Sequence, residues 1–562
     1  MNSVNLQAEP SSASPAFVPK PAAAEAASRE AALRAAIRQG REAALACARG
    51  LRGKFAIGVN DAELRRTLLV VDRFATHTLC YRLQDGVLRF SASASDLVDG
   101  AGAIDPQAIL DYLYFHVIPS PRTIYREVHR VPPGHALWAE GGRVELVPLW
   151  QPRLDAPAPA AAFGALRDEF LALLEQAVAR RLDGSPAACF LSGGTDSSTV
   201  AGMIRRVTGG PAESYSIGFE AEGYDEMEYA RLAARHFGTR HHEYYVTPAD
   251  LLAGMPKVAA HHDQPFGNSS ALPAYYCALR AREDGVSHML AGDGGDELFG
   301  GNVRYAKQKV FDWYLGIPQP LRTAWLEPLS ATGWAQKVPL LKKAASYVNQ
   351  ARVPMPDRMQ TYNLLHRLGD GEIFAPGFLS QVDLGAPLAH EREVWAGHPA
   401  DNLLNRMLAF DWRYTLAEND LVKVRGSTGL AGVDVSYPLL DDDLADFSLR
   451  LPVDLKLRGL KLRWFFKEAL RGFLPDEIIT KSKHGFGLPF GTWLCNDSGL
   501  QGLARDALAS FDRRGVLATG FAERLLKVHL PAHPGFYGEM VWLIVMLELW
   551  LRAHAPDWRA GG

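Results

Sequence analysis

The sequence has few of the features that mark secreted, zinc-binding or membrane proteins. Its five cysteines lie far apart and form no Cys-x-x-Cys pair, which argues against a zinc site or a disulfide framework. The longest apolar run, Met540 to Leu547, is too short to cross about 30 Å of hydrocarbon and predicts a buried helix. The start of the chain shows no basic-then-apolar signal pattern. We therefore expect reduced thiols, a cytoplasmic location and no membrane partner.

The sequence also lacks an excess of charge of either sign. Sixty Lys and Arg side chains stand against 63 Asp and Glu, so the formal net charge is only -3. Such a balance favours neither nucleic acid nor an anionic surface as the main partner. With 562 residues, 48% of them hydrophobic, the chain is long enough for two or more domains with full cores.

The first 150 residues divide into three stretches of different composition. Residues 1 to 23 are rich in Ala, Pro and Ser and predict a disordered tail, whereas the Ala-rich residues 24 to 50 predict a helix. Residues 51 to 150 carry short β-like runs separated by turn signals such as Gln84-Asp85-Gly86, which predicts a small antiparallel β domain. The predicted strands of this domain cover residues 54–59, 67–71, 79–82 and 87–91.

Strands and helices alternate after a Pro- and Ala-rich linker at residues 152–159 and an amphipathic helix at 163–182. The predicted strands are residues 187–191, 214–219, 242–246 and 286–291, and the predicted helices begin at Ser197, Asp225 and Leu272. Helical crossovers between strands give a doubly wound parallel α/β sheet, with ligands at the carboxyl ends of the strands. The mostly helical remainder after Phe299 is expected to form a cap over that edge.

The first loop at this edge is Ser192-Gly193-Gly194-Thr195-Asp196-Ser197-Ser198. Its two glycines permit a sharp turn that exposes successive N–H groups, and the helix behind it adds a positive dipole end. This combination predicts a phosphate cradle. No Gly-Lys-Ser/Thr follows, so the lysine of a P-loop is missing and a different phosphate geometry is implied. The alternative is a Gly-rich turn without a ligand.

A second loop, Gly292 to Gly301, places acids among glycines directly after a predicted strand. Carboxylates beside a phosphate need a cation between them. Asp196 and Asp296 would together offer oxygen ligands to Mg2+, which prefers a few carboxylates together with phosphate oxygens and water. The alternative is a solvated acidic turn.

These loops and four further strings together resemble the synthetase domain of the asparagine synthetase B family. The strings are Tyr224-Asp225-Glu226-Met227-Glu228-Tyr229-Ala230, Leu421-Val422-Lys423-Val424, Asp434 through Pro438-Leu439-Leu440-Asp441, and Lys481-Ser482-Lys483-His484-Gly485-Phe486-Gly487-Leu488-Pro489. The resemblance covers Phe163 to Trp550 within a domain at 163–558, and it implies an adenine nucleotide alpha hydrolase-like fold. In that family a carboxylate attacks the α-phosphate of ATP, and an amine nitrogen then displaces AMP from the acyl-adenylate. ATP and Mg2+ are the implied cofactors.

The resemblance also implies roles for individual residues. Pyrophosphate would be held by Ser192, Gly193, Gly194, Ser197 and Ser198, adenine would lie against Leu191, Ile217 and Gly292, and Mg2+ would bind Asp196 and Asp296. Lys483 would add a fixed positive charge as a catalytic residue, although it could equally be a surface lysine. Asp293 matches a position that is an acid in asparagine synthetases and Tyr in β-lactam synthetases, and it would orient or deprotonate the incoming amine.

The N-terminal domain matches the family only in part. Leu51 to Ala56 and Asp72 to Ser91 resemble strands of the family's N-terminal nucleophile glutaminase domain. The catalytic cysteine expected directly after the initiator Met is replaced by Asn2, the glutamine-binding Asn-Gly-Glu string is absent, and Arg52 stands in place of an acid. Residues 51 to 150 are therefore predicted to be a degenerate glutaminase domain, with ammonia or a substrate amine as the nitrogen donor.

The predicted cap departs from the family at Arg425, Thr428 and Ser436, where Asp, Met and Arg are usual, and at Asn302, which replaces an aromatic. Our leading prediction is an ATP- and Mg2+-dependent amide-forming ligase that acts on a small-molecule or peptide carboxylate. Three alternatives stay open: a macrolactam cyclase of the lasso-peptide type, an asparagine synthetase fed by a separate glutaminase, and a non-catalytic nucleotide-binding adaptor. A homodimer is also left open.

Overall fold

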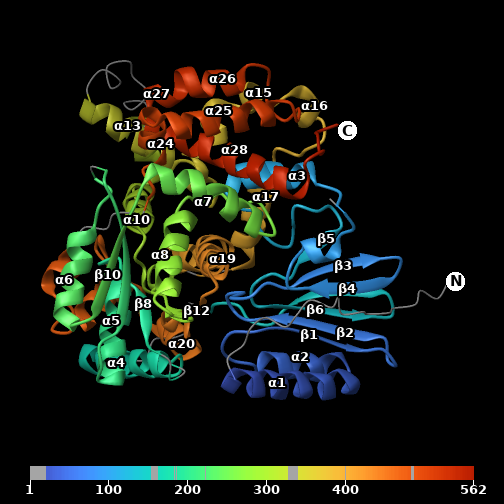
Figure 1. Ribbon diagram of the computed structural model, residues 1–562. Helices are drawn as coiled ribbons and strands as arrows, with labels where there is room; N and C mark the ends of the chain where they lie inside the picture. The colour runs from blue at the N-terminus through green and yellow to red at the C-terminus, as the bar shows by residue number, and fades with distance from the viewer. Residues whose placement is uncertain are drawn as a thin grey trace.

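The protein is described by a computed structural model that places residues 20–100, 102–153, 162–182, 184, 186–221, 223–326, 339–398, 400, 402–481 and 487–561. The predicted tail therefore lies outside the described residues except for its last part, Lys20 to Ala23, which opens the first helix. The chain forms a β-rich N-terminal domain, a parallel α/β domain beside it, and a helical region above both (Figure 1).

Two antiparallel sheets form the N-terminal domain. The first has the order β1-β2-β6-β7 and the second the order β4-β3-β5. Their bounds are β1 (Ala56–Asp61), β2 (Arg66–Val71), β3 (Cys80–Gln84), β4 (Val87–Ser91), β5 (Val128–Arg130), β6 (His135–Glu140) and β7 (Arg143–Pro148). Because strand side chains alternate, Leu68 and Val70 of β2 pack under the N-terminal helices, whereas Leu69 and Val71 pack with Leu79 and Leu88 on the opposite face. The four strands predicted here are confirmed, and β5, β6 and β7 were not predicted.

The N-terminal helices cover the outer face of the first sheet (Figure 1). The stretch predicted as one helix at residues 24–50 consists of two, α1 (Lys20–Gln39) and α2 (Arg41–Arg49). Gly40 separates them with a φ of 118°, a conformation that only glycine adopts readily. Leu33, Ile37 and Leu45 are fully buried and form the face by which these helices pack on the sheet.

The parallel sheet has the strand order β10-β9-β8-β11-β12. Its strands are β8 (Ala188–Phe190), β9 (Glu213–Phe219), β10 (Arg240–Val246), β11 (His288–Leu290) and β12 (Asp434–Ser436), and every neighbouring pair is parallel. This confirms the doubly wound α/β prediction. The order reverses between β8 and β11, which is where ligands bind in open sheets of this kind. The fifth strand, β12, was not predicted because it has only three residues and follows a long helical stretch.

Helices cover both faces of the parallel sheet (Figure 1). One face is covered by α5 (Thr195–Thr208) and α6 (Met227–Phe237), with α4 (Phe163–Ala179) packed on α5. The other face is covered by α8 (Ala271–Glu283) and α19 (Leu421–Ala431), with α7 (Pro248–His261) packed on α8. The longer helices elsewhere are α3 (Pro106–Phe115), α10 (Val303–Leu315), α13 (Pro339–Ala351), α17 (Ala386–Gly397), α18 (Leu403–Asp411), α20 (Asp442–Arg450), α24 (Phe490–Asn496), α25 (Ser498–Asp512) and α28 (Pro534–His554).

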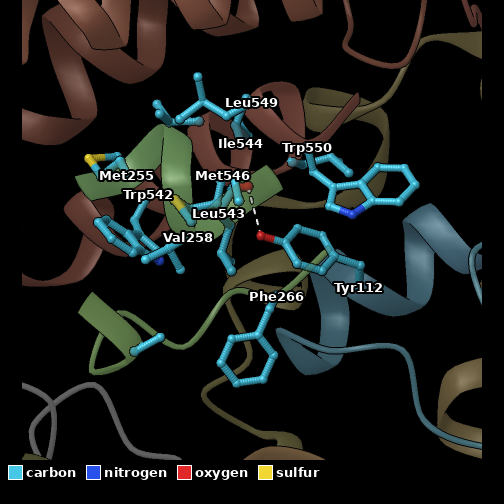
Figure 2. Packing of buried hydrophobic residues seen from close by; sticks show 14 of the residues in the cluster. Tyr112, Met255, Val258, Phe266, Trp542, Leu543, Ile544, Met546, Leu549 and Trp550 are labelled. Atoms are coloured by element: carbon cyan, nitrogen blue, oxygen red, sulfur yellow. Dashed lines mark hydrogen bonds between the residues drawn. The ribbon is translucent and has the colours of Figure 1, made fainter. Parts of the chain in front are cut away.

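The last helix, α28, lies in the main hydrophobic core (Figure 2). It packs on α7, α24 and α25, and the Tyr112 hydroxyl of α3 donates to the Leu543 carbonyl at 3.0 Å. This helix is long and apolar enough to cross a membrane by length and composition, yet 72% of its apolar window is buried inside the protein. The fully buried Glu548 forms ion pairs with Arg514 at 2.6 Å and Arg552 at 2.9 Å. These contacts make α28 a core helix, as predicted for Met540 to Leu547.

A buried ion pair joins the N-terminal domain to the α/β domain. Arg130 of β5 lies 2.6 Å from Glu418, and both side chains are more than nine-tenths buried. Glu418 also accepts from the Ser120 hydroxyl, at 2.5 Å, and lies 3.3 Å from Arg413. Burial opposes ionisation of Glu418, but the two arginines lower its pKa below the ordinary value. The carboxylate is thus held in its charged form at the domain boundary.

Candidate active site

Both predicted glycine loops lie at the switch between β8 and β11, in direct contact with each other. A Cβ on Gly292 would lie 2.8 Å from the backbone nitrogen of Ser197, and a Cβ on Gly295 would overlap the Asp196 carboxylate. Glycine at these two positions is what lets the loops approach so closely. The structure thus brings together the two strings that the sequence separates by about a hundred residues.

The first loop is a tight turn built on Gly193, whose φ is 69°. A Cβ there would lie 2.5 Å from the carbonyl carbon of Tyr229 at the start of α6, so the loop is pressed against that helix. The Ser197 hydroxyl accepts from the Ser192 backbone N–H at 3.1 Å and lies 3.1 Å from the Ser192 hydroxyl. The Ser198 hydroxyl is buried and has no hydrogen-bond partner among the residues that the structure describes. The turn and the N-terminus of α5 form an anion-binding arrangement.

The residues predicted to face adenine differ in how far they are exposed. The Leu191 side chain is 1% exposed, and its carbonyl accepts from the Ser216 hydroxyl. Ile217 on β9 and Gly292 are partly exposed. An adenine ring at this position would therefore contact the Ile217 side chain and the backbone around Leu191 and Gly292, rather than the Leu191 side chain.

One residue of this site was missed at the sequence level. Arg463 is the residue that joins the two loops, although it lies 268 positions after Thr195. Its guanidinium donates to the Thr195 hydroxyl at 2.7 Å, contacts both oxygens of Asp196, and lies 3.1 Å from Asp296. Its backbone has a φ of 54°, which is unusual for a side chain of this size, and its N–H donates to the Gly300 carbonyl at 3.1 Å. No spacing rule in the sequence could have pointed to it.

The contacts of Arg463 test whether Asp196 and Asp296 could hold a metal. Both carboxylates contact the same guanidinium, Asp196 at Nη2 and Asp296 at Nε, so the two acids are close neighbours. Their side chains keep 23% and 19% exposure, which leaves room for water or phosphate oxygens. No group of three or more His, Cys, Asp or Glu side chains that could hold a metal occurs in the described part of the chain. Two carboxylates completed by substrate oxygens fit Mg2+ better than a metal held by protein alone.

Asp293, in the second loop, belongs to a second group of charges. Its carboxylate is 3.9 Å from the Lys423 ammonium, which is 2.8 Å from Asp420. Burial raises the pKa of Asp293 to about 6, because the loss of water outweighs the attraction of Lys423. Asp420 ends η4 (Trp412–Asp420), a π-helical turn between α18 and α19. Such turns commonly mark functional sites, and the turn sets Asp420 and Lys423 opposite the second loop.

Lys483 lies outside the described residues, so its predicted position stays a prediction. The preceding Lys481 forms an ion pair with Glu226 at 2.9 Å and lies 4.2 Å from the Tyr229 ring centre. Lys467, on α22 (Trp464–Ala469), has a pKa lowered by burial and by the nearby Arg463. The edge of the site therefore carries two lysines beside the loop that Tyr229 supports.

The strand order and the interlocked loops define an adenine nucleotide alpha hydrolase-like domain preceded by a separate β domain. Comparison with known proteins agrees with this. A family model described as asparagine synthase matches residues 169–552, and one described as a glutamine amidotransferase domain matches residues 26–150. The second match begins before the boundary predicted at Leu51, so it includes the helices that cover the first sheet.

Curated relatives extend over most of the chain. A putative glutamine-hydrolysing asparagine synthetase of Mycobacterium tuberculosis is 27% identical over 479 residues, which is 79% of this chain and 68% of that protein. Asparagine synthetase 1 of Bacillus subtilis is 23% identical over 509 residues, 89% of this chain and 77% of that protein. The amidase chyE of Penicillium rubens is 24% identical over 491 residues, covering 79% and 70%. The chain belongs to the asparagine synthase family, and it is a carbon–nitrogen ligase.

Proposed function

We propose that this ligase activates a carboxylate with ATP as an acyl-adenylate, releases pyrophosphate and transfers an amine nitrogen to the acyl group. The observation that supports this most strongly is that Asp196 and Asp296 both contact the Arg463 guanidinium, next to a loop whose geometry suits an anion. When pyrophosphate leaves, negative charge builds up on its oxygens. N–H donors and a cation beside those oxygens stabilise that charge.

Each part of the site has a role in this proposal. The Gly193 turn and the Ser192 and Ser197 hydroxyls hold the pyrophosphate oxygens. Asp196 and Asp296 would hold Mg2+, which neutralises the phosphate charge when bound. Arg463 keeps the two carboxylates directed at one point.

Asp293 acts in the second step, because an amine must be neutral before it attacks. Its raised pKa of about 6 lies near the working pH of a general base, while it is still ionised at pH 7. Lys423 and Asp420 orient its carboxylate. This combination favours transfer of ammonia or of an amine that Asp293 can reach.

We further propose that the chain does not hydrolyse glutamine itself. Cys80 is fully buried and burial raises the pKa of its thiol, so it is not a reactive nucleophile. Arg52 pairs with Asp443 at 2.6 Å, and the Gly53 N–H donates to Asp442 at 2.5 Å, so this part of the degenerate domain serves as a contact surface for α20. Purified protein should release no glutamate from glutamine; steady glutamate release would refute this proposal.

The central experiment is a substrate-dependent ATP–pyrophosphate exchange assay. Aspartate, other small acids and precursor peptides that carry a carboxylate side chain are supplied with Mg-ATP. We expect one class of acid to support exchange, and Asp196→Ala and Asp296→Ala to abolish it. Asp476→Ala, whose side chain is 75% exposed, is the control and should keep full exchange. Retained activity in both site variants would mean that the metal position is wrong. If none of the acids supports exchange, the result would favour a non-catalytic adaptor.

The identity of the acid separates the remaining alternatives. Exchange with aspartate, followed by asparagine formation from ammonia, would indicate an asparagine synthetase fed from elsewhere. Exchange with a peptide and loss of one water mass would indicate a macrolactam cyclase. The cytoplasmic location and the homodimer remain predictions.

A further inference from the structure

A cavity of about 80 Å³ lies between the N-terminal domain and the end of the parallel sheet, apart from the paired glycine loops. Its lining combines residues from both domains: Lys54, Thr76, His77, Arg425, Thr428, Gly429, Val433, Asp434, Val435 and Tyr437. Two of them, Arg425 and Thr428, are positions where the sequence departs from the family. The volume is that of a few water molecules, and the polar lining makes it a place for a polar occupant.

The charges around the cavity do not cancel. Lys54 lies 3.3 Å from Asp434, so these two form a pair. Arg425 donates one hydrogen bond, to the Thr76 carbonyl at 2.9 Å, and no carboxylate in the described part of the chain forms an ion pair with it. Arg425 is partly buried, and this burial lowers the pKa of its guanidinium. A partly buried cation of this kind is costly unless an anion accompanies it.

His77 adds a second unused polar group to the same lining. None of the described residues forms a hydrogen bond with its ring. Burial, together with the positive charges of Arg425 and Lys54, lowers its pKa to about 4. The ring is therefore neutral at pH 7, and its N–H is available to a ligand in the cavity.

We propose that this cavity binds a small monocarboxylate, with Arg425 as the ion-pair partner and His77 as a neutral donor. Arg425 has no ion-pair partner among the described residues, and the attraction of Asp263 does not outweigh its burial, so its charge matches one negative charge of a ligand. The planar fork of Arg425 matches the two oxygens of a carboxylate. Asp434 in the lining disfavours a dianion such as phosphate. Lys54, at 36% side-chain exposure, marks the side that opens to solvent. None of its lining residues belongs to the glycine loops, although Tyr437 of the lining lies close enough to Asp293 for that charge to add to burial in raising the pKa of Tyr437.

His77 itself supplies the readout. The full chain is labelled with isotope-enriched histidine, the His77 signal is assigned with His77→Gln, and sodium acetate is titrated against sodium chloride at constant ionic strength without ATP. We expect a saturable shift of the His77 signal and an increase in its titration midpoint, because a bound anion stabilises the protonated ring. Arg425→Gln should weaken acetate binding by about tenfold or more, since it removes the charge-assisted pair.

Controls separate this site from general effects of charge. Arg41→Gln changes a partly exposed arginine of α2 that pairs with Glu145, and it should leave acetate binding unchanged. Asp196→Asn should also leave it unchanged, so the outcome does not depend on the ligase proposal. If Arg425→Gln does not fold, Lys54→Gln at the open side replaces it and should weaken binding. A His77 signal that does not saturate, or that saturates equally without Arg425, would overturn the proposal. Equal or tighter binding of phosphate or sulfate would overturn the assignment to carboxylates.

Discussion

Arg463 lets the central part of the site be tested without any substrate. Replacing it by Met keeps much of the apolar stem but removes the cation that faces Asp196 and Asp296. The two carboxylates would then face each other without compensation. We expect a less stable protein whose stability responds strongly to Mg2+.

The size of the effect follows from the contacts. At the 3.1 Å separation from Asp296, one charge pair is worth about 5 kcal/mol in gross attraction at an effective dielectric constant of about 20. The cost of burying Arg463, whose side chain is only 7% exposed, offsets much of that gain. Breaking a buried pair typically costs about 3–5 kcal/mol, and the partial exposure of both carboxylates lowers our expectation to about 2–3 kcal/mol.

Thermal unfolding of the full chain with and without MgCl2 measures this. Arg463→Met should melt several degrees below the wild type. Mg2+ at about 100 times its Kd should raise the free energy of unfolding of this variant by about 2.7 kcal/mol. Arg471→Met is the control, because that side chain is 45% exposed in surface pairs and its replacement should leave the melting temperature near that of the wild type. Equal stability of the two variants, or no Mg2+ response in Arg463→Met, would refute the assignment of Asp196 and Asp296 to one cation position.

Three further predictions concern the base, the cradle and the domain boundary. With Asp293 as the proposed base and its pKa at about 6, the rate of the amide-forming step should rise with pH through that value, because only the ionised carboxylate accepts a proton. Asp293→Asn should remove this pH dependence and slow the step about 100-fold while pyrophosphate exchange persists. Gly193 and Gly209 have nearly the same φ, 69° and 68°, so replacing either by Ala introduces a similar backbone strain of about 1–2 kcal/mol. Only Gly193 is pressed against α6, so only Gly193→Ala should lose pyrophosphate exchange. Glu418→Gln should destabilise the protein by about 3–5 kcal/mol in chemical denaturation, against less than about 1 kcal/mol for the exposed Asp168→Asn. Pairing lowers the pKa of Glu418, so this difference is fully present above about pH 4.3 and shrinks as pH falls through the lowered value; a constant difference would contradict the pairing.

The parts of the fold with strong periodicity could be predicted from the sequence. Four of the five parallel strands and the helices between them follow from short apolar runs and helical spacing, and the parallel orientation of the strands follows from the need for crossovers. The split at Gly40 and the short strand β12 could not be predicted, because one glycine in an Ala-rich helix is a weak signal and three residues carry no period.

The sequence predicted only those parts of the candidate site whose residues lie close together in the chain. Glycines and acids within one loop indicate a turn and its charge, and two such loops at strand ends indicate a shared edge. The positions of Arg463 and of the π-helical turn that presents Asp420 depend on contacts between distant segments, which the spacing of residues in the sequence does not predict. The family comparisons fix the class of reaction but leave the acid open, because the relatives include proteins named as asparagine synthetases and a protein named as an amidase.

The position of α28 has a consequence for biosynthesis. The indole N–H groups of Trp542 and Trp550 donate to the carbonyls of Gly267 and His262 at 2.9 Å, and Leu543 accepts from Tyr112 of a helix made much earlier. A nascent chain in which α28 has not yet emerged lacks the partner of all three groups and leaves a large apolar surface uncovered. The two domains can therefore reach their final packing only after α28 has been made, and until then that surface is open to aggregation.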